Sequence, residues 1–315
     1  IHFDFCLAKD CIWAKKDFRI SSAQSILRET PIIKERHLPK EKILTFLESI
    51  SPCLFRVPTE NDGLKNYFNQ KGKPESAFYW ENKAYIPWME LDLLHLETKV
   101  LENYKTEDFA FYKCIELSAG KNALPKFKGK KLGEFVIRVP LSKKEKEPVK
   151  VELIFDIDPS IPALPRIGIE AIISHNFESI TWIGEGPQET YPDRKTGAFL
   201  GTYKHSISEL YVPYIVPQEN GNRMGTRFLS IESKSEKMQI SSETPIDFSA
   251  SCFTTENMLE ATHTYQLENT FKEKGYWILH LDVAQRGVGS AACGPDTLPE
   301  YWVQGGLYKA TLYIG

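Results

Sequence analysis

Two short polar segments of the chain carry the residue types that acid–base chemistry and sugar binding use. They are Gly184–Arg194 (GEGPQETYPDR) and Val216–Arg223 (VPQENGNR), and both combine carboxylates with Gly, Pro and Arg. Two carboxylates about 5–9.5 Å apart can hydrolyse a glycosidic bond, but sequence spacing alone does not pair them. The same residue types form tight, hydrogen-bonded turns. We interpret both segments as structural turns, in which Asp193 ties a loop down, and keep catalysis as the alternative.

Motifs for nucleotide binding and for nucleophilic catalysis are absent from the sequence. No G-x-S-x-G, G-x-x-x-x-G-K-[ST] or G-x-G-x-x-G pattern occurs. Gly184 and Gly186 form a lone G-x-G that Pro187 follows. The seven histidines include no H-x-H or H-x-x-x-H pair, so a zinc site has little local support. We expect each histidine to be structural or to lie on the surface.

The composition describes a globular protein rather than a disordered, collagenous or coiled-coil chain. Of 315 residues, 42% are hydrophobic and 12% are aromatic, which favours strands or, where exposed, surfaces that stack on sugars. The net charge of −3 provides no basis for general nucleic-acid binding. No apolar run approaches the roughly 18 residues of a membrane span. The chain starts at Ile1 rather than Met, which is compatible with a segment excised from a longer chain.

Cysteine usage favours a cytoplasmic location. Six cysteines are scattered along the chain without a C-x-x-C pair. A disulfide framework normally occurs in a shorter secreted chain with denser spacing. Polar residues interrupt the N-terminus, so the chain opens without a signal peptide. We expect reduced thiols in a cytoplasmic protein.

The elements that would position the polar segments are mostly strands. Five segments have the length, β-branched and aromatic content and bounding residues of strands: Glu134–Leu141, Lys150–Asp158, Arg166–Ser174, Tyr276–Val283 and Leu307–Ile314. In the fourth segment His280 and Asp282 alternate with apolar residues, which predicts one buried face. Two short helices are expected, at Glu75–Lys83 and at Thr254–Thr262, with Thr254 as N-cap. Long alternation of strands and helices is absent, which argues against a parallel doubly wound sheet or a barrel of βα units.

The polar segments also resemble motifs of a known family. The chain resembles the C-terminal region of glycoside hydrolase family 2 β-galactosidases, with five motifs in the family's order over about 260 residues. The matching motifs are Phe55–Asp62 (FRVPTEND), Trp182–Arg194 (WIGEGPQETYPDR), Tyr211–Arg223 (YVPYIVPQENGNR), Gly287–Pro295 (GVGSAACGP) and Leu298–Tyr301 (LPEY). Phe55 stands where the family usually has Trp.

The resemblance implies an all-β fold, a large antiparallel β supersandwich of the galactose mutarotase-like type with few short helices. Residues 1–28 resemble the end of a preceding immunoglobulin-like domain, which is too small to form its own core. We expect this remnant to be disordered or paired onto the large domain. Residues 29–52 are expected to be a linker or shortened first strands, and residues 53–315 the supersandwich domain.

The resemblance implies hydrolysis of terminal β-D-galactose from lactose-like galactosides with retention. The family's two catalytic glutamates and its magnesium and sodium ligands lie in a barrel that this chain lacks. The chain is therefore expected to hold no catalytic residue, metal site or cofactor of its own. Its partners would be a barrel-bearing chain or domain and the galactoside, with an exposed apolar surface where the barrel docks. Neither nucleic acid nor membrane is expected as a partner.

The resemblance points to one substrate-binding position. The loop Gly287–Pro295 would border the active-site cleft, where family members carry an aromatic Trp or a Cys, and this chain has Cys293. A Cys lacks the ring face that stacks on a sugar, so other groups would supply affinity there, or Cys293 simply fills a tight loop. Three alternatives stay open: a free-standing galactose- or carbohydrate-binding module, a truncated degenerate gene product and a mutarotase-type epimerase.

Overall fold

The computed structural model describes residues 1–26, 38–63, 84–107, 109–142, 146–161, 163–267, 275–292 and 294–315. The chain divides into two compact units, Ile1–Pro31 and Ile32–Gly315. The predicted helix Glu75–Lys83 and the predicted site residue Cys293 both lie outside the described residues.

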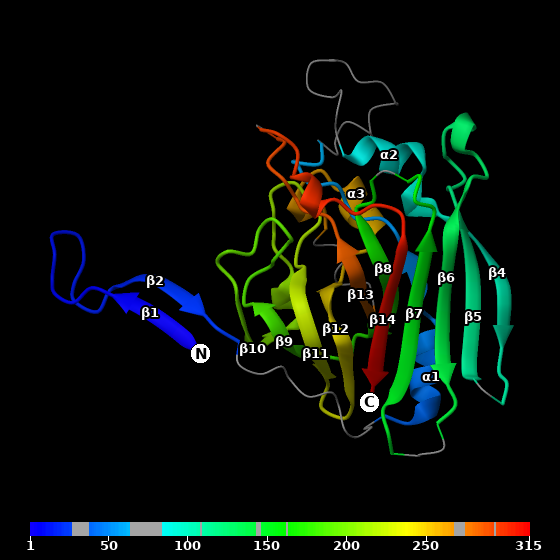
Figure 1. The fold of residues 1–315 in the computed structure, drawn as a ribbon, viewed down its shortest axis with the longest axis horizontal. Coiled ribbons are helices and arrows are strands. Elements are labelled where there is room, and N and C mark those ends of the chain that lie inside the picture. Colours follow the sequence, from blue (N-terminus) through cyan, green and yellow to red (C-terminus); the bar gives the residue numbers. More distant parts are fainter. Residues whose placement is uncertain are drawn as a thin grey trace. The chain divides into compact units, whose positions relative to one another are not determined.

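The first unit is a two-stranded antiparallel hairpin of β1 (His2–Cys6) and β2 (Arg19–Gln24) (Figure 1). Its strands pair with each other, while the expectation that this remnant is disordered or paired onto the large domain stays a prediction. Alternation along β1 brings Phe3 and Phe5 to the same face as Ser21 and Ala23. Phe3 and Phe5 remain about half exposed, which is unusual for aromatic residues of a strand.

The second unit is built around one hydrogen-bonded sheet of twelve strands, all antiparallel (Figure 1). Its strands are β3 (Ser51–Cys53), β4 (Glu97–Tyr104), β5 (Phe109–Ser118), β6 (Lys131–Pro140), β7 (Val149–Ile157), β8 (Arg166–Ser174), β9 (Ser179–Gly186), β10 (Phe199–Ser206), β11 (Arg223–Glu232), β12 (Lys237–Ser251), β13 (Tyr276–Gln285) and β14 (Leu307–Ile314). The five predicted strands are confirmed as β6, β7, β8, β13 and β14, and the all-β antiparallel fold class is confirmed with them.

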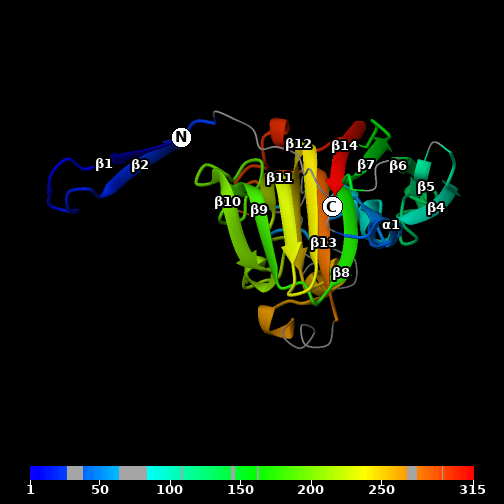
Figure 2. The ribbon, with the colours of Figure 1, turned by 90° about the horizontal axis from the view of Figure 1, so that it is seen from below.

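The long strand β12 divides this sheet into two branches. Its residues Ile240–Ser242 pair with β14, which continues through β7, β6 and β5 to β4. Its residues Asp247–Ser251 pair with β13, which continues through β8 to β3. Figure 2 shows β10, β9, β11, β12, β13 and β8 following one another. The single strand β12 therefore belongs to both branches, and the two branches enclose one core.

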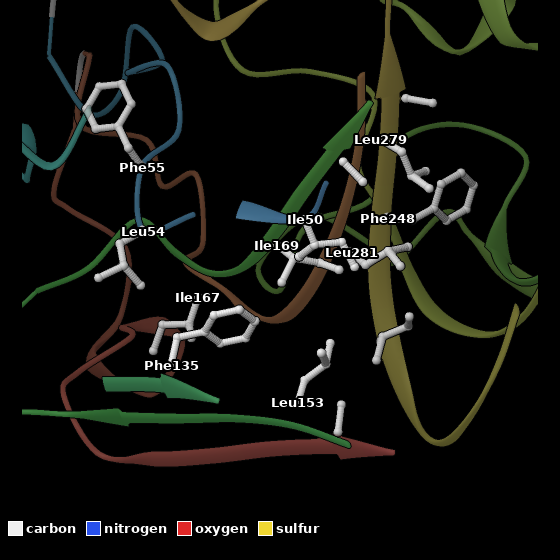
Figure 3. Close-up of a cluster of buried hydrophobic side chains, with 14 of the residues drawn as sticks. Ile50, Leu54, Phe55, Phe135, Leu153, Ile167, Ile169, Phe248, Leu279 and Leu281 are labelled. Atoms are coloured by element: carbon white, nitrogen blue, oxygen red, sulfur yellow. The ribbon is translucent and has the colours of Figure 1, made fainter. Parts of the chain in front are cut away.

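The core lies where the two branches face each other. The buried side chains labelled in Figure 3 come from β6, β7, β8, β12 and β13 and from the segment before Arg56, and they belong to one cluster. Phe135 on β6 and Phe155 on β7 stack with ring centroids 4.5 Å apart, and both are fully buried. Strand β13 is buried on both faces, so the prediction of one buried face is wrong. His280 and Asp282 point into polar surroundings inside the protein rather than into solvent.

Among the described residues the helices are few and short, as expected. They are α1 (Lys40–Glu48), α2 (Tyr85–Glu90) and α3 (Thr255–Glu260), with short 3₁₀ turns between the other elements. The predicted helix at Thr254–Thr262 is confirmed as α3, whose N-cap Thr254 accepts a hydrogen bond from Asn257 N. Helix α1 lies within residues 29–52, where the sequence pattern predicted no helix, and it buries Ile43 and Leu47 against the core.

The stacked phenylalanines provide a test of the core. Phe135→Ala is expected to lower the free energy of unfolding by about 3–5 kcal/mol, because it removes a fully buried ring and leaves a cavity. The matched control is Val100→Ala on β4, whose eight residues are all exposed, with an expected change within about 0.5 kcal/mol. Urea unfolding followed by circular dichroism measures both. Equal losses in the two variants would contradict this location of the core.

Candidate functional site

The candidate site is the loop that follows β13, Gly287–Pro295, together with the motif segments that hold it. The loop's backbone is fixed by side chains from regions more than 90 residues away in sequence. Cys293 itself lies outside the described residues, so the site is described through the residues on either side of it.

Arg56 anchors the base of the loop from inside the protein. Its guanidinium is fully buried and donates to the carbonyl oxygens of Arg286, at 2.5 Å, and Gly287, at 3.0 Å. The same group pairs with both carboxylate oxygens of Asp62, at 2.8 and 3.0 Å. Asp62 also accepts hydrogen bonds from the backbone N–H and hydroxyl of Thr59. The segment FRVPTEND is therefore a turn closed around Asp62 that presents Arg56 to the loop.

Asn61, from the same turn, holds the middle of the loop. Its Nδ2 donates to Gly289 O at 2.7 Å, and its Oδ1 accepts from Ala292 N at 3.2 Å. One amide group thus fixes two points of the loop three residues apart. The sequence offered the resemblance of FRVPTEND to a family motif, but nothing that paired Asn61 with this loop.

Asp193 holds the loop from the other side. It accepts hydrogen bonds from Val288 N at 2.9 Å, from Gly289 N at 2.7 Å and from the Thr297 hydroxyl at 2.6 Å. Partial burial raises the pKa of Asp193, but these hydrogen bonds outweigh it and keep that pKa below its ordinary value. The expectation that Asp193 ties a loop down is confirmed, and the loop is the one that contains Cys293.

Two glycines make this approach possible. A Cβ at Gly287 would come within 2.5 Å of the Asp193 carboxylate and 2.6 Å of the Thr297 hydroxyl. Gly289 has φ +65°, in the left-handed region that favours glycine, and a Cβ there would lie 2.9 Å from Thr297 N. The spacing G-x-G at the start of the loop is therefore required by the backbone conformation and by Asp193.

The two polar segments of the sequence lie side by side and are joined by Glu189. Its carboxylate pairs with Arg194, accepts from the Tyr214 hydroxyl and accepts from Gly221 N at 2.7 Å. Thr190 N also donates to Asn222 O at 2.8 Å. These contacts confirm that both segments are hydrogen-bonded turns.

Next to these segments the surface is hollowed into an open cavity of about 730 Å³. Its wall includes Pro187, Glu189, Arg194, Lys195 and Arg223. His205 and Tyr214 also line it. No sequence pattern indicated that His205, on β10, would line the same cavity as the polar segments.

A buried ion cluster lies behind the site and links it to the sheet. Arg166 on β8 pairs with Glu219 at 2.7 Å and with Asp282 on β13 at 3.1 Å, and all three side chains are at most 5% exposed. Glu219 N donates to Val57 O, which joins this cluster to the Arg56 turn. Buried charges are tolerated when they are paired. Asp282 was expected only as a polar residue of an alternating strand.

His280 is another buried polar residue of β13. Its Nε2 lies 3.6 Å from a carboxylate oxygen of Glu170 on β8. Burial, aided by the positive charge of Arg166, lowers the pKa of His280 well below its ordinary value. Neither residue lines the 730 Å³ cavity, so this pair has no described access to a substrate there. For His280 the expectation of a structural histidine agrees with this burial.

The described residues contain neither a candidate metal cluster nor a candidate membrane-spanning helix. No group of three or more His, Cys, Asp or Glu side chains there is arranged to hold a metal ion. No helix in the described ranges is both long and apolar enough to cross a membrane. No disulfide joins the cysteines outside position 293.

Asp193→Asn tests the hold on the loop. At pH 7 the substitution is expected to lower the free energy of unfolding by about 1–3 kcal/mol, because a charged acceptor of three hydrogen bonds is lost. Folding lowers the pKa of Asp193, so its contribution exists above the ordinary carboxyl pKa and disappears as pH falls through the lowered value. Urea unfolding should therefore show a smaller difference between variant and parent at pH 3 than at pH 7.

The control for this substitution is Asp156→Asn, at an exposed position of β7, with an expected change within about 0.5 kcal/mol. Hydrogen exchange at the amides of Val288 and Gly289 should accelerate in Asp193→Asn alone. Unchanged exchange and unchanged stability at pH 7 would contradict the assigned role.

Arg166→Met tests the buried ion cluster. The substitution leaves the carboxylates of Glu219 and Asp282 buried without their cation, and a loss of about 3–5 kcal/mol in unfolding free energy is expected. Lys204→Met breaks the more exposed pair of Lys204 with Glu232 and should cost less than about 1 kcal/mol. Thermal and urea unfolding compare the two, and similar losses would exclude a special role for the buried cluster.

Comparison with known proteins agrees with the motifs. The family model of the β-galactosidase small chain matches residues 24–314. A β-galactosidase of Actinobacillus pleuropneumoniae is 32% identical over 149 residues, which are 47% of this chain and 14% of that protein. A β-galactosidase of Kluyveromyces lactis is 39% identical over 142 residues, 44% of this chain and 13% of that protein.

A solved structure also aligns with the chain, at low similarity. It is a putative aldose 1-epimerase from Escherichia coli K12, with a TM-score of 0.35 and 11% identity over 89% of this chain and 88% of that one. The aligned regions of the two curated relatives make up only 13–14% of those proteins. Because the family model extends over nearly the whole chain, the protein belongs to the β-galactosidase small-chain family, the C-terminal region of glycoside hydrolase family 2 β-galactosidases.

Proposed function

We propose that the chain is the non-catalytic small-chain part of a β-galactosidase that hydrolyses terminal β-D-galactose from lactose-like galactosides with retention. It would complete the active-site cleft of a barrel-bearing chain or domain and be inactive alone. The barrel would supply the two catalytic glutamates and the magnesium and sodium ions. We further propose a cytoplasmic location.

The main support for this proposal is that the carboxylates at the candidate site are already hydrogen-bonded or ion-paired within the chain. A retaining glycosidase needs two carboxyl groups free to act on the sugar. Here Asp62, Glu189, Asp193 and Glu219 are each bound to an arginine or to several hydrogen-bond donors of the chain itself. These groups build and fix the loop Gly287–Pro295, which supports a structural contribution to a cleft whose chemistry comes from elsewhere.

Cys293 is proposed to lie in that cleft. The loop around it is fixed at Gly289 and Ala292 by Asn61, and at Val288 and Gly289 by Asp193. A thiol offers a small surface and no ring face for stacking on a sugar. Affinity for the part of the substrate beyond galactose would then depend on other groups, including those of the barrel.

The hairpin supports assembly with a further chain or domain. A two-stranded hairpin is at best marginally stable in water without a further surface to pack on. Trp13 is 63% exposed and Ile12 fully exposed, and Phe3 and Phe5 form an apolar face. We propose that these exposed side chains form the surface that packs on the barrel-bearing part.

A chromogenic galactoside assay tests the proposal. The purified chain alone is expected to give no turnover. Mixed with the barrel-bearing part of a β-galactosidase of this family that lacks its own small-chain domain, it should restore turnover. Normal turnover by the chain alone, or no restoration by any such barrel-bearing part, would contradict the proposal.

The double variant Phe3→Ser/Phe5→Ser separates assembly from folding. We expect at least about tenfold weaker complementation, because two aromatic side chains are lost from the proposed interface. The matched control is Ile172→Ser, which removes a similarly exposed apolar side chain from β8 and should leave complementation unchanged. Thermal unfolding of the second unit, Ile32–Gly315, should be the same in both variants and the parent.

A further inference from the structure

The open cavity beside the two polar segments has a wall in which the negative charges are already engaged. Glu189 is bound by Arg194, Tyr214 and Gly221 N. Asp193 is bound by Val288 N, Gly289 N and Thr297, as described above. Glu209, at the rim, accepts from the backbone N–H and hydroxyl of Ser206. Each of these three carboxylates is hydrogen-bonded within the chain, and Glu189 is also neutralised by Arg194.

Arg223 is the cation of this wall that lacks a counter-ion. Its side chain belongs to a residue only 3% exposed. It donates from Nε to Pro187 O and from Nη1 to Gly221 O and Asn222 O, all of them neutral carbonyl groups. Among the described residues no carboxylate lies within ion-pair distance of it, and its Nη2 makes none of these bonds. Burial lowers the pKa of Arg223 to about 10.

Other buried arginines of the chain show how unusual this is. Arg56 pairs with Asp62, Arg166 with Glu219 and Asp282, and Arg286 with Asp296 at 2.6 Å. Burying a guanidinium without an anion is costly, since water no longer solvates its charge. An anion supplied from outside the chain would remove that cost at Arg223.

Two further cations, Arg194 and Lys195, line the same cavity and have N–H donors left for a ligand. A guanidinium has five N–H groups, and Arg194 uses one from each Nη, to Tyr214 at 3.1 Å and to Glu189. The ammonium of Lys195 is nearly half exposed and lies 3.7 Å from Glu185. Arg194 and Lys195 therefore add cationic donors to a wall that surrounds a space of about 730 Å³. That volume lies within the range of small-molecule sites.

We propose that this cavity is a binding site for a small ligand with an anionic oxygen group, a carboxylate, sulfate or phosphate, that pairs with Arg223. Arg194 and Lys195 contribute further donors, and the planar fork of Arg223 suits two oxygens of one such group. All of its groups belong to this chain, so its binding test needs no barrel-bearing part.

Calorimetric titration of the purified chain with sodium phosphate, sodium sulfate and trisodium citrate tests the proposal. Sodium chloride keeps the ionic strength constant, and D-galactose is the uncharged comparison. We expect saturable binding of one anion per chain for at least one of the three, and none for galactose. Arg223 lies over the Trp182 ring, 5.5 Å from its centroid, so binding should also change tryptophan emission. The three arms distinguish a phosphate or sulfate site from a carboxylate site.

Arg223→Lys keeps the charge and removes the forked donor, and it should weaken binding at least about tenfold. Arg138→Lys, on β6 and away from the cavity, is the matched control and should bind as the parent does. If Arg223→Lys fails to fold, Lys195→Ala and Arg194→Gln replace it, each with an expected loss of at least about threefold. Absence of saturable anion binding, or equal affinity in the parent and all three cavity variants, would overturn the proposal.

Discussion

The structure depends on two buried guanidinium groups, those of Arg56 and Arg166, that are paired with carboxylates inside the protein. Arg56 and Arg166 are at most 1% exposed, and each joins segments that are distant in sequence. Arg56 connects a turn near residue 60 to the loop after β13, and Arg166 connects β8 to β13 and to the second polar segment. Because removing either partner would leave a buried charge, these segments have little freedom to separate. The positions of the motifs therefore follow from charge pairing as much as from the strands.

The sequence predicted the strands well because their signal is local. β6, β7, β8, β13 and β14 each show the length and composition of a strand, and Thr254 marks the start of α3 by a capping residue. What failed was the burial of β13, because alternation of polar and apolar residues normally means one solvated face. His280 and Asp282 are polar but buried, because His280 contacts Glu170 and Asp282 pairs with Arg166 on the neighbouring strand. Such pairing depends on strand order, which no local pattern contains.

The candidate site was predictable only in part for the same reason. Carboxylates, Gly and Pro in the two polar segments identified turns, and Asp193 was recognised as a residue that fixes a loop. Which loop it fixes depends on a contact across 95 residues, and the role of Asn61 on a contact across 228. The family motifs indicated that these segments matter together, but not that Arg56, Asn61 and Asp193 converge on one stretch of backbone.

The two units of the chain differ in how far they bury their apolar side chains. The second unit encloses its own core between the two branches that β12 connects. The hairpin has two strands and an exposed apolar face, and two strands cannot enclose a core. Its conformation in water must therefore gain from a surface that this unit does not itself contain. Folding of the second unit and the proposed docking of the hairpin are then separable properties of one chain, so substitutions in the hairpin can change the proposed assembly while the loop Gly287–Pro295 keeps its geometry.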